Sequence, residues 1–157
     1  MPEQKVTISH DVAADPQTVW AVLTDLEHAA ETLSGVSRVE VLTEGEYAVG
    51  TRWRETRKMF GKEATEEMEV TEVSAPTSTA VEAHSSGVDY RSVFTLTPLP
   101  SGTRLEVTFA GSQRNPSLLR KLFWAAFGRL GMKASAKMMR GDLEDIARRA
   151  ESMTRGG

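Results

Sequence analysis

The sequence predicts an α+β fold: a seven-stranded, curved antiparallel sheet wrapped around a long C-terminal helix, with two short helices between the first two strands. Three observations support it. Apolar residues recur at every second position through most of residues 36–111, short turn sequences interrupt this pattern, and a long helical sequence follows. Strands joined by short turns pair antiparallel. The apolar face of such a sheet must be covered, and only the long helix is large enough to cover it.

The N-terminal segment is expected to form the first strand and both short helices. Residues 4–12 alternate in the manner of a half-buried strand, with His10 on the same face as Ile8. Asp15 can cap a helix, and Pro16 suits the first helical position because its missing N–H would be unpaired there anyway. The pair at residues 24–25 is expected to interrupt this helix, so that a second one covers roughly residues 25–33.

Six further strands are expected from the alternating pattern and from the turn residues between the segments. These turns contain Gly, Pro and Ser at the breaks. The expected strands lie near residues 37–44, 50–60, 63–74, 78–86, 88–98 and 102–111.

A helix over roughly residues 116–152 is expected to begin at Asn115-Pro116 and to fray from Thr154 onward. At about 100° per residue, one stripe of this helix is apolar and should face the sheet. The stripe consists of Met132, Ser135, Ala136, Met139, Leu143, Ile146 and Ala150.

The apolar residues of segment 118–130 are out of phase with that stripe. Gly128 and Gly131 lie at the junction, and each weakens a helix by about 1 kcal/mol relative to Ala. We therefore expect the helix to bend or break near 128–131, with Phe123 and Phe127 as anchors of the preceding segment. Burial through a kink, a homodimer contact and a weak membrane contact remain open for 118–130.

Composition excludes several classes of protein. The chain of 157 residues has no cysteine, so disulfides and thiolate chemistry are absent, and its three histidines have no metal-ligand spacing. We expect no metal and no cofactor. Residues 1–111 carry 9 basic against 18 acidic side chains, and residues 112–157 carry 10 against 4. The acidic part would repel phosphate, so no nucleic-acid partner is expected. No signal-peptide pattern is present, which favours a cytoplasmic protein.

Several short segments of the chain are informative when they are taken together. They are Val19-Trp20-Ala21-Val22-Leu23-Thr24-Asp25, Leu33-Ser34-Gly35-Val36, Val49-Gly50-Thr51-Arg52-Trp53, Phe94-Thr95-Leu96-Thr97-Pro98, Gly102-Thr103-Arg104-Leu105, Asp142-Leu143-Glu144-Asp145-Ile146 and Ala150-Glu151. Together they resemble the START-like (SRPBCC) superfamily, and most of all its polyketide cyclase/dehydrase and lipid-transport branch. The resemblance covers about the whole chain in element order and implies a helix-grip fold in a single domain, 1–157. It also implies a small hydrophobic ligand as partner.

Strand parity predicts which side chains face the helix and could line a cavity. Buried charge is costly unless it is paired, so Arg57 is expected to pair with Glu55 or Glu66. Either the polar residues orient a ligand, or they form a salt bridge at the cavity mouth. The predicted ligand-binding residues are Trp53, Glu55, Arg57, Glu66, Met68, Tyr90, Ser92, Phe94, Val107, Met132 and Met139.

Three functions fit these residues. The first is binding of a lipid-like or polyketide-like molecule in a cavity of a few hundred Å³ between sheet and helix. The second is a cofactor-free cyclase or dehydratase, with His10, Glu66 and Tyr90 as candidate acid, base and hydrogen-bond donor. The third is a protein-interaction module of the chaperone-activator type, which would have a small or filled cavity.

Overall fold

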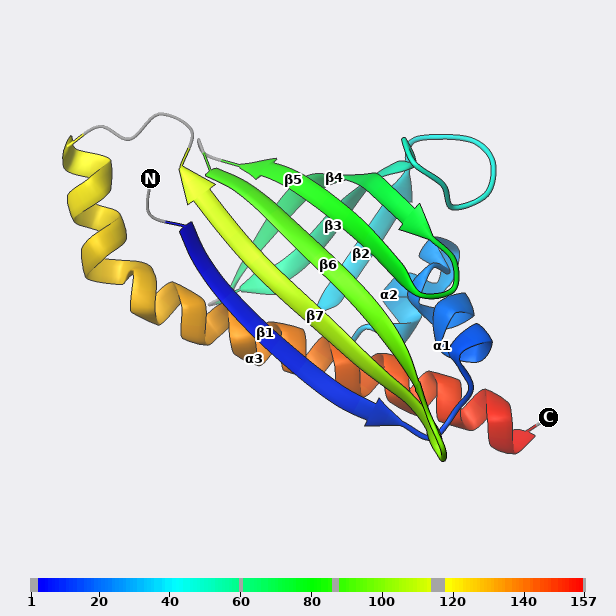
Figure 1. Ribbon diagram of the computed structural model, residues 1–157. Helices are drawn as coiled ribbons and strands as arrows, with labels where there is room; N and C mark the ends of the chain where they lie inside the picture. Colours follow the sequence, from blue (N-terminus) through cyan, green and yellow to red (C-terminus); the bar gives the residue numbers. More distant parts are fainter. Residues whose placement is uncertain (1–2, 60, 86–87, 114–117, 157) are drawn as a thin grey trace.

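The computed structural model (Figure 1) describes residues 3–59, 61–85, 88–113 and 118–156. Seven antiparallel strands form one sheet in the order β1-β7-β6-β5-β4-β3-β2. The elements in chain order are β1 (Glu3–Val12), α1 (Pro16–Leu23), the 3-10 helix η1 (Leu26–His28), α2 (Ala29–Thr32), β2 (Val36–Val41), β3 (Arg52–Met59), β4 (Lys62–Ser74), β5 (Ser78–Ser85), β6 (Val88–Leu99), β7 (Gly102–Gln113) and α3 (Leu118–Gly156).

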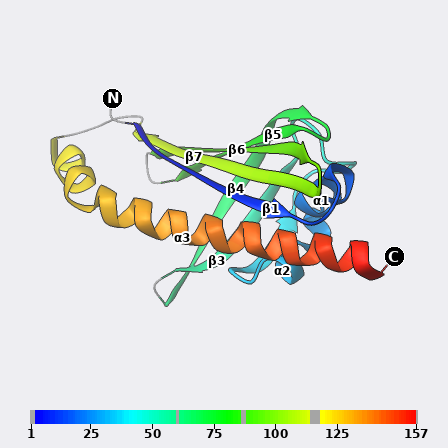
Figure 2. The ribbon, with the colours of Figure 1, turned by 60° about the horizontal axis from the view of Figure 1, so that its bottom comes forward.

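The arrangement is the helix-grip fold that the sequence predicts. The sheet curves, and α3 runs along its concave side, while α1 and α2 close one end (Figures 1 and 2). Strand β1 pairs with β7, the last strand in the chain, so the N-terminal strand joins the sheet at the edge beside which α3 passes.

The start of α1 follows the predicted capping chemistry. The Asp15 carboxylate accepts a hydrogen bond from the Thr18 backbone N–H at 2.8 Å, and Pro16 occupies the first turn. The helix ends at Leu23, with Thr24 as its C-cap, as expected. The second short helix differs from the expectation because it divides into η1 and α2.

The observed strand boundaries lie close to the expected ones, except at the end of β2. That strand stops at Val41, three residues before the expected end, and residues 42–51 form a connecting loop. Register irregularities occur between Val36 and Arg38 and between Val70 and Glu72. The second irregularity lies beyond Met68. It therefore leaves the alternation in the first half of β4 intact, and Glu66 and Met68 both face inward as predicted.

The core forms where α3 lies directly against β1 and β7. Leu105 and Val107 of β7 and Leu143 of α3 have no exposed surface. Of the predicted apolar stripe, Met139, Leu143, Ile146 and Ala150 are buried, whereas Ser135 and Ala136 are half-buried. On the opposite side of α3 Lys133, Lys137 and Arg140 are exposed, as expected.

Helix α3 is hydrogen-bonded without a break from Leu118 to Gly156, so it extends past the expected end at 152. Its first turns, drawn in yellow, run at a clear angle to the rest in both views (Figures 1 and 2). A change of direction in this helix was expected, and its expected position, near 128–131, stays a prediction. The side chains of residues 118–132 lie outside the described part, so the proposed anchors Phe123 and Phe127 stay predictions. No helix in the described ranges combines the length and apolar character needed to cross a membrane.

Candidate functional site

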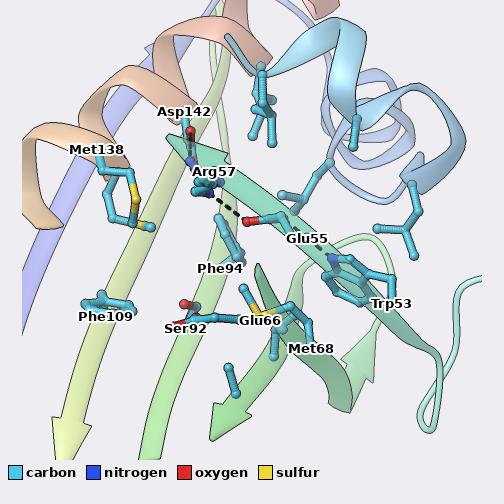
Figure 3. Close-up of a pocket in the computed structure, with 18 of the residues that line it drawn as sticks. Trp53, Glu55, Arg57, Glu66, Met68, Ser92, Phe94, Phe109, Met138 and Asp142 are labelled. Atoms are coloured by element: carbon cyan, nitrogen blue, oxygen red, sulfur yellow. Dashed lines mark hydrogen bonds and ion pairs between the residues drawn. The ribbon is translucent and has the colours of Figure 1, made fainter. Parts of the chain in front are cut away.

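A cavity of about 230 Å³ lies between the sheet and α3, with residues of α1, η1 and α2 at one end of it. Its floor comes from β3 to β7, its roof from α3 and its end wall from the short helices. Most of the lining is apolar, with a polar group on one side (Figure 3). The lining residues are Val22, Leu23, Leu26, Ala29, Thr32, Leu33, Tyr47, Trp53, Glu55, Arg57, Ala64, Glu66, Met68, Val81, Ala83, Tyr90, Ser92, Phe94, Phe109, Ser135, Met138, Met139, Asp142 and Ile146.

The polar group is centred on Arg57, which joins β3 to α3 across the cavity wall. Its Nη1 and Nη2 donate to the two carboxylate oxygens of Asp142 at 3.0 and 2.7 Å. Its Nε donates to Glu55 Oε2 at 2.7 Å, and the Trp53 indole N–H reaches Glu55 Oε1 at 3.5 Å. Figure 3 shows these groups lying one after another along β3 under α3. The pairing of Arg57 with Glu55 confirms one of the two predicted partners, and Asp142 is a partner that the sequence did not reveal.

Burial and the neighbouring charges shift the pKa values of Arg57 and Asp142 in opposite directions. Burial by itself lowers the pKa of Arg57, but the hydrogen bonds and negative charges of Asp142 and Glu55 outweigh it, so the pKa lies above its ordinary value. Burial raises the pKa of the Asp142 carboxyl, and the two Arg57 hydrogen bonds oppose that rise. The guanidinium therefore stays charged, held by a two-pronged contact to one carboxylate and a single contact to another.

A second aspartate of α3 fixes the loop that precedes β2. Asp145 Oδ2 accepts hydrogen bonds from the backbone N–H and the hydroxyl of Ser34 at 2.9 and 2.8 Å. These bonds, with the Arg148 contact, outweigh burial and lower the pKa of Asp145. The next residue, Gly35, leaves room for the arginine, because a Cβ there would lie 3.3 Å from Arg57 Nη1. This end of the cavity is therefore held closed by α3.

The far side of the polar wall contains Glu66, Tyr90 and Ser92. Tyr90 stacks on Phe109 with ring centroids 5.5 Å apart. Burial, and the charge of Glu66, raise the pKa of the Tyr90 hydroxyl, so it stays protonated at neutral pH and can donate a hydrogen bond. Glu66 lies opposite Glu55 in the β3–β4 register, on the same inward face.

Tyr47, from the loop between β2 and β3, closes the cavity beside α1. Its hydroxyl lies 2.8 Å from the Thr79 hydroxyl, which itself donates to the Glu72 carbonyl. Its ring meets Trp20 of α1 edge to face, with centroids 6.4 Å apart. Burial raises the pKa of Tyr47, and the Thr79 contact opposes that rise. The tyrosine thus ties the loop to β5 and to α1.

Most of the predicted ligand-binding residues lie in the cavity wall, and their role in binding stays a prediction. The residues so placed are Trp53, Glu55, Arg57, Glu66, Met68, Tyr90, Ser92, Phe94 and Met139. Val107 was placed wrongly, because α3 packs directly on that part of β7 and Val107 is completely buried in the core. The side chain of Met132 lies outside the described part.

The candidate catalytic residues do not converge on one place. Glu66 and Tyr90 line the cavity, whereas His10 lies on β1, paired in register with Leu105 and outside the lining. The other two histidines are exposed and contact surface carboxylates. Within the described ranges, no three His, Asp or Glu side chains are grouped closely enough to hold a metal ion.

Sequence reasoning missed Asp142 and the end wall. Asp142 was assigned only to a family segment, although an acidic residue three positions from Met139 on the buried stripe could have indicated a partner for an inward arginine. Leu23, Leu26 and Leu33 line the cavity because the short helices turn their apolar sides toward it. The sequence shows that these leucines have helical spacing, but it does not show which way that apolar face points relative to the sheet.

Comparison with known proteins gives a family and a fold. The profile of a family described as polyketide cyclase/dehydrase and lipid transport matches residues 3–151. A search of curated protein sequences found no match.

Solved structures that are similar to the chain share little sequence identity with it. The protein TTHA0849 from Thermus thermophilus has a TM-score of 0.77 at 19% identity, over 98% of this chain and 99% of that one. The ZhuI aromatase/cyclase from Streptomyces sp. R1128 has a TM-score of 0.74 at 20% identity, over 98% and 96%. Norcoclaurine synthase from Thalictrum flavum has a TM-score of 0.74 at 15% identity, over 98% and 97%. At these identities the likeness establishes the fold.

Proposed function

The chain belongs to the polyketide cyclase/dehydrase and lipid-transport family, and we propose that it binds a small hydrophobic molecule in the cavity between the sheet and α3. The observation that carries the proposal is the cavity itself. About 230 Å³ of space is unfilled inside a chain whose other half is tightly packed. Protein interiors are normally close-packed, so a space of this size requires a reason.

The lining supports a ligand with an apolar body. Met68 and Met138 lie around the space together with Phe94 and Phe109 (Figure 3). Met139 also lines it. Methionine side chains are flexible and polarisable, so they adapt to irregular shapes. A polyketide-like or lipid-like molecule fits such a lining, and the polar wall would orient one end of it.

Filling the cavity from its floor tests the proposal. Ala83 is buried and lines the cavity, so Ala83→Leu would place a larger side chain in the ligand space. We expect the affinity for the neutral probe N-phenyl-1-naphthylamine, followed by its fluorescence, to fall about tenfold or more, which is ~1.4 kcal/mol. His84→Leu is the matched control, because His84 is the next residue of β5 and is exposed on the other face. Equal binding by both variants would contradict the proposal.

A cofactor-free cyclase or dehydratase is the second candidate. It is favoured by Glu66 and Tyr90, a carboxylate and a protonated hydroxyl that both line a mostly apolar cavity. Tyr90 would donate a hydrogen bond to a substrate carbonyl, and Glu66 would accept a proton from the adjacent carbon. Tyr90→Phe should then abolish turnover of a poly-β-ketone while retaining binding. A pure carrier would show no turnover in either form.

The third candidate, a protein-interaction module, has less support. It implied a small or filled cavity and depended on segment 118–130, whose side chains lie outside the described part. The homodimer and membrane contacts suggested for that segment, the absence of a nucleic-acid partner and the cytoplasmic location remain predictions.

A further inference from the structure

The charges in the cavity wall restrict what kind of hydrophobic molecule can bind, if the proposed binding function holds. Four formally charged side chains line the cavity: Glu55, Arg57, Glu66 and Asp142. Three are acids and one is a base. Even if Asp142 is counted as neutral, because burial raises its pKa, two carboxylates face one guanidinium. The wall therefore carries excess negative charge. Glu55 and Asp142 are buried and Glu66 is half-buried, so this charge is less screened than it would be on an open surface.

Arg57 is poorly placed to receive an anionic ligand. Three of its five N–H groups already point at carboxylate oxygens, at 2.7 to 3.0 Å. Gly35 closes in on the Nη1 side, where even a Cβ would lie only 3.3 Å away. A ligand carboxylate would have to displace Asp142 or Glu55 and would leave a buried carboxylate without its partner. That exchange is costly.

Glu66 is the charged group that remains available. It faces the cavity, and it forms no hydrogen bond or ion pair with any side chain in the described part of the chain. It also lies directly opposite Glu55 across the β3–β4 pair. Like charges directly opposite each other on a sheet are destabilising, so a cation placed beside Glu66 would relieve that repulsion.

We propose that the cavity selects molecules in which an apolar, aromatic-sized body carries a protonated amine, that it discriminates against carboxylates, and that Glu66 is the specificity-determining residue. The apolar body lies among the methionines and Phe94, and the ammonium group lies against Glu66 at the wall that Tyr90 also lines. Since a hydrogen bond to a charged group is stronger than one between neutral groups, the amine gains more than an alcohol of the same shape.

Three probes of one shape test the proposal by titration calorimetry with the full chain at pH 7. They are 2-(2-naphthyl)ethylamine, 2-(2-naphthyl)ethanol and 2-naphthylacetate. We expect the amine to bind most tightly and the carboxylate about tenfold or more weakly. Glu66→Gln should weaken amine binding about tenfold and leave alcohol binding within about twofold. Glu69→Gln, a matched control on β4 that removes the same charge from the exposed face, should leave the order unchanged.

Charge reversal gives a readout that does not depend on loss of binding. In Glu66→Lys the carboxylate should bind more tightly than the amine. If the naphthylacetate binds the wild-type chain as tightly as the amine, or if Glu66→Gln leaves the order unchanged, this inference is wrong and the proposed binding function stands. If none of the probes binds and the neutral dye does not bind either, the binding function itself fails.

Discussion

The two halves of the sheet have the same alternating pattern, but one half forms packed core and the other forms the wall of a cavity. In the core half, on the β1 side, the inward residues Leu96, Leu105 and Val107 are buried beneath α3. In the cavity half, on the side of β3, β4 and β5, the inward residues include Glu55, Arg57 and Glu66. They surround a cavity that Phe94 of β6 and Phe109 of β7 also line. Alternation alone therefore determines which face is covered, and the distance of the covering helix determines whether that face becomes core or cavity.

The difference also indicates where polar residues are tolerated inside the fold. A charged side chain under the closely packed part of α3 would have no partner and no water. On the cavity side Arg57 reaches Asp142 of α3, so an ion pair spans a distance that packed apolar side chains do not fill. The cavity half is held by a few polar contacts, and the core half by many apolar ones.

The largest expected effect comes from removing the centre of that polar contact. Arg57→Met leaves Glu55 and Asp142 buried without their partner, and we expect unfolding by urea to show a loss of about 3–5 kcal/mol. Arg54→Met is the control, since Arg54 lies on the same strand with an exposed partner and should cost less than about 1 kcal/mol. A similar loss of stability in both variants would contradict the prediction that the buried ion pairs of Arg57 contribute more than the exposed one of Arg54.

The next effect compares the two halves directly. Leu143→Ala opens a cavity in the packed half and should cost about 2–5 kcal/mol. Met68→Ala enlarges a space that already exists, in a half-buried wall, and should cost less than about 1.5 kcal/mol. Both losses can be measured by urea unfolding. Equal losses would show that the cavity half is as tightly packed as the core half.

The smallest expected effect is the stability contributed by Asp145, and it depends on pH. The folded state lowers the pKa of Asp145, so its contribution to stability is present above the unfolded pKa of about 3.9 and is lost as pH falls through the lower, folded pKa. Asp145→Asn should therefore cost about 1 kcal/mol at pH 7, and the difference from wild type should shrink in acid. Glu144→Gln, at the exposed neighbouring position, should show neither effect. A pH-independent loss in Asp145→Asn would exclude the ionised hydrogen bonds to Ser34 as its source.

Sequence reasoning located the strands and most of the cavity wall because both depend on local periodicity. Trp53 fixed the inward face of β3, and Glu55 and Arg57 followed from it by alternation, as did their contact with each other. Asp142 and the end wall from Leu23 to Leu33 depend on how α3 and the short helices are placed against the sheet. That placement is set by packing between segments far apart in the chain, which no local pattern records. The same reason accounts for Val107. Its side chain points inward as predicted, but it packs against α3 in the core and does not line the cavity.

The pairing of β1 with β7 has a consequence for the order in which the chain can be assembled. Thr7 and Thr108 meet across this pair, 101 positions apart. During synthesis β1 leaves the ribosome before the other six described strands, and the strand that it pairs with, β7, is made after the rest of them. Until then β1 is an unpaired edge, able to pair with the wrong strand or with another chain. Closing so long a loop is slow, so we expect the joining of β1 to be a late, rate-limiting step of folding.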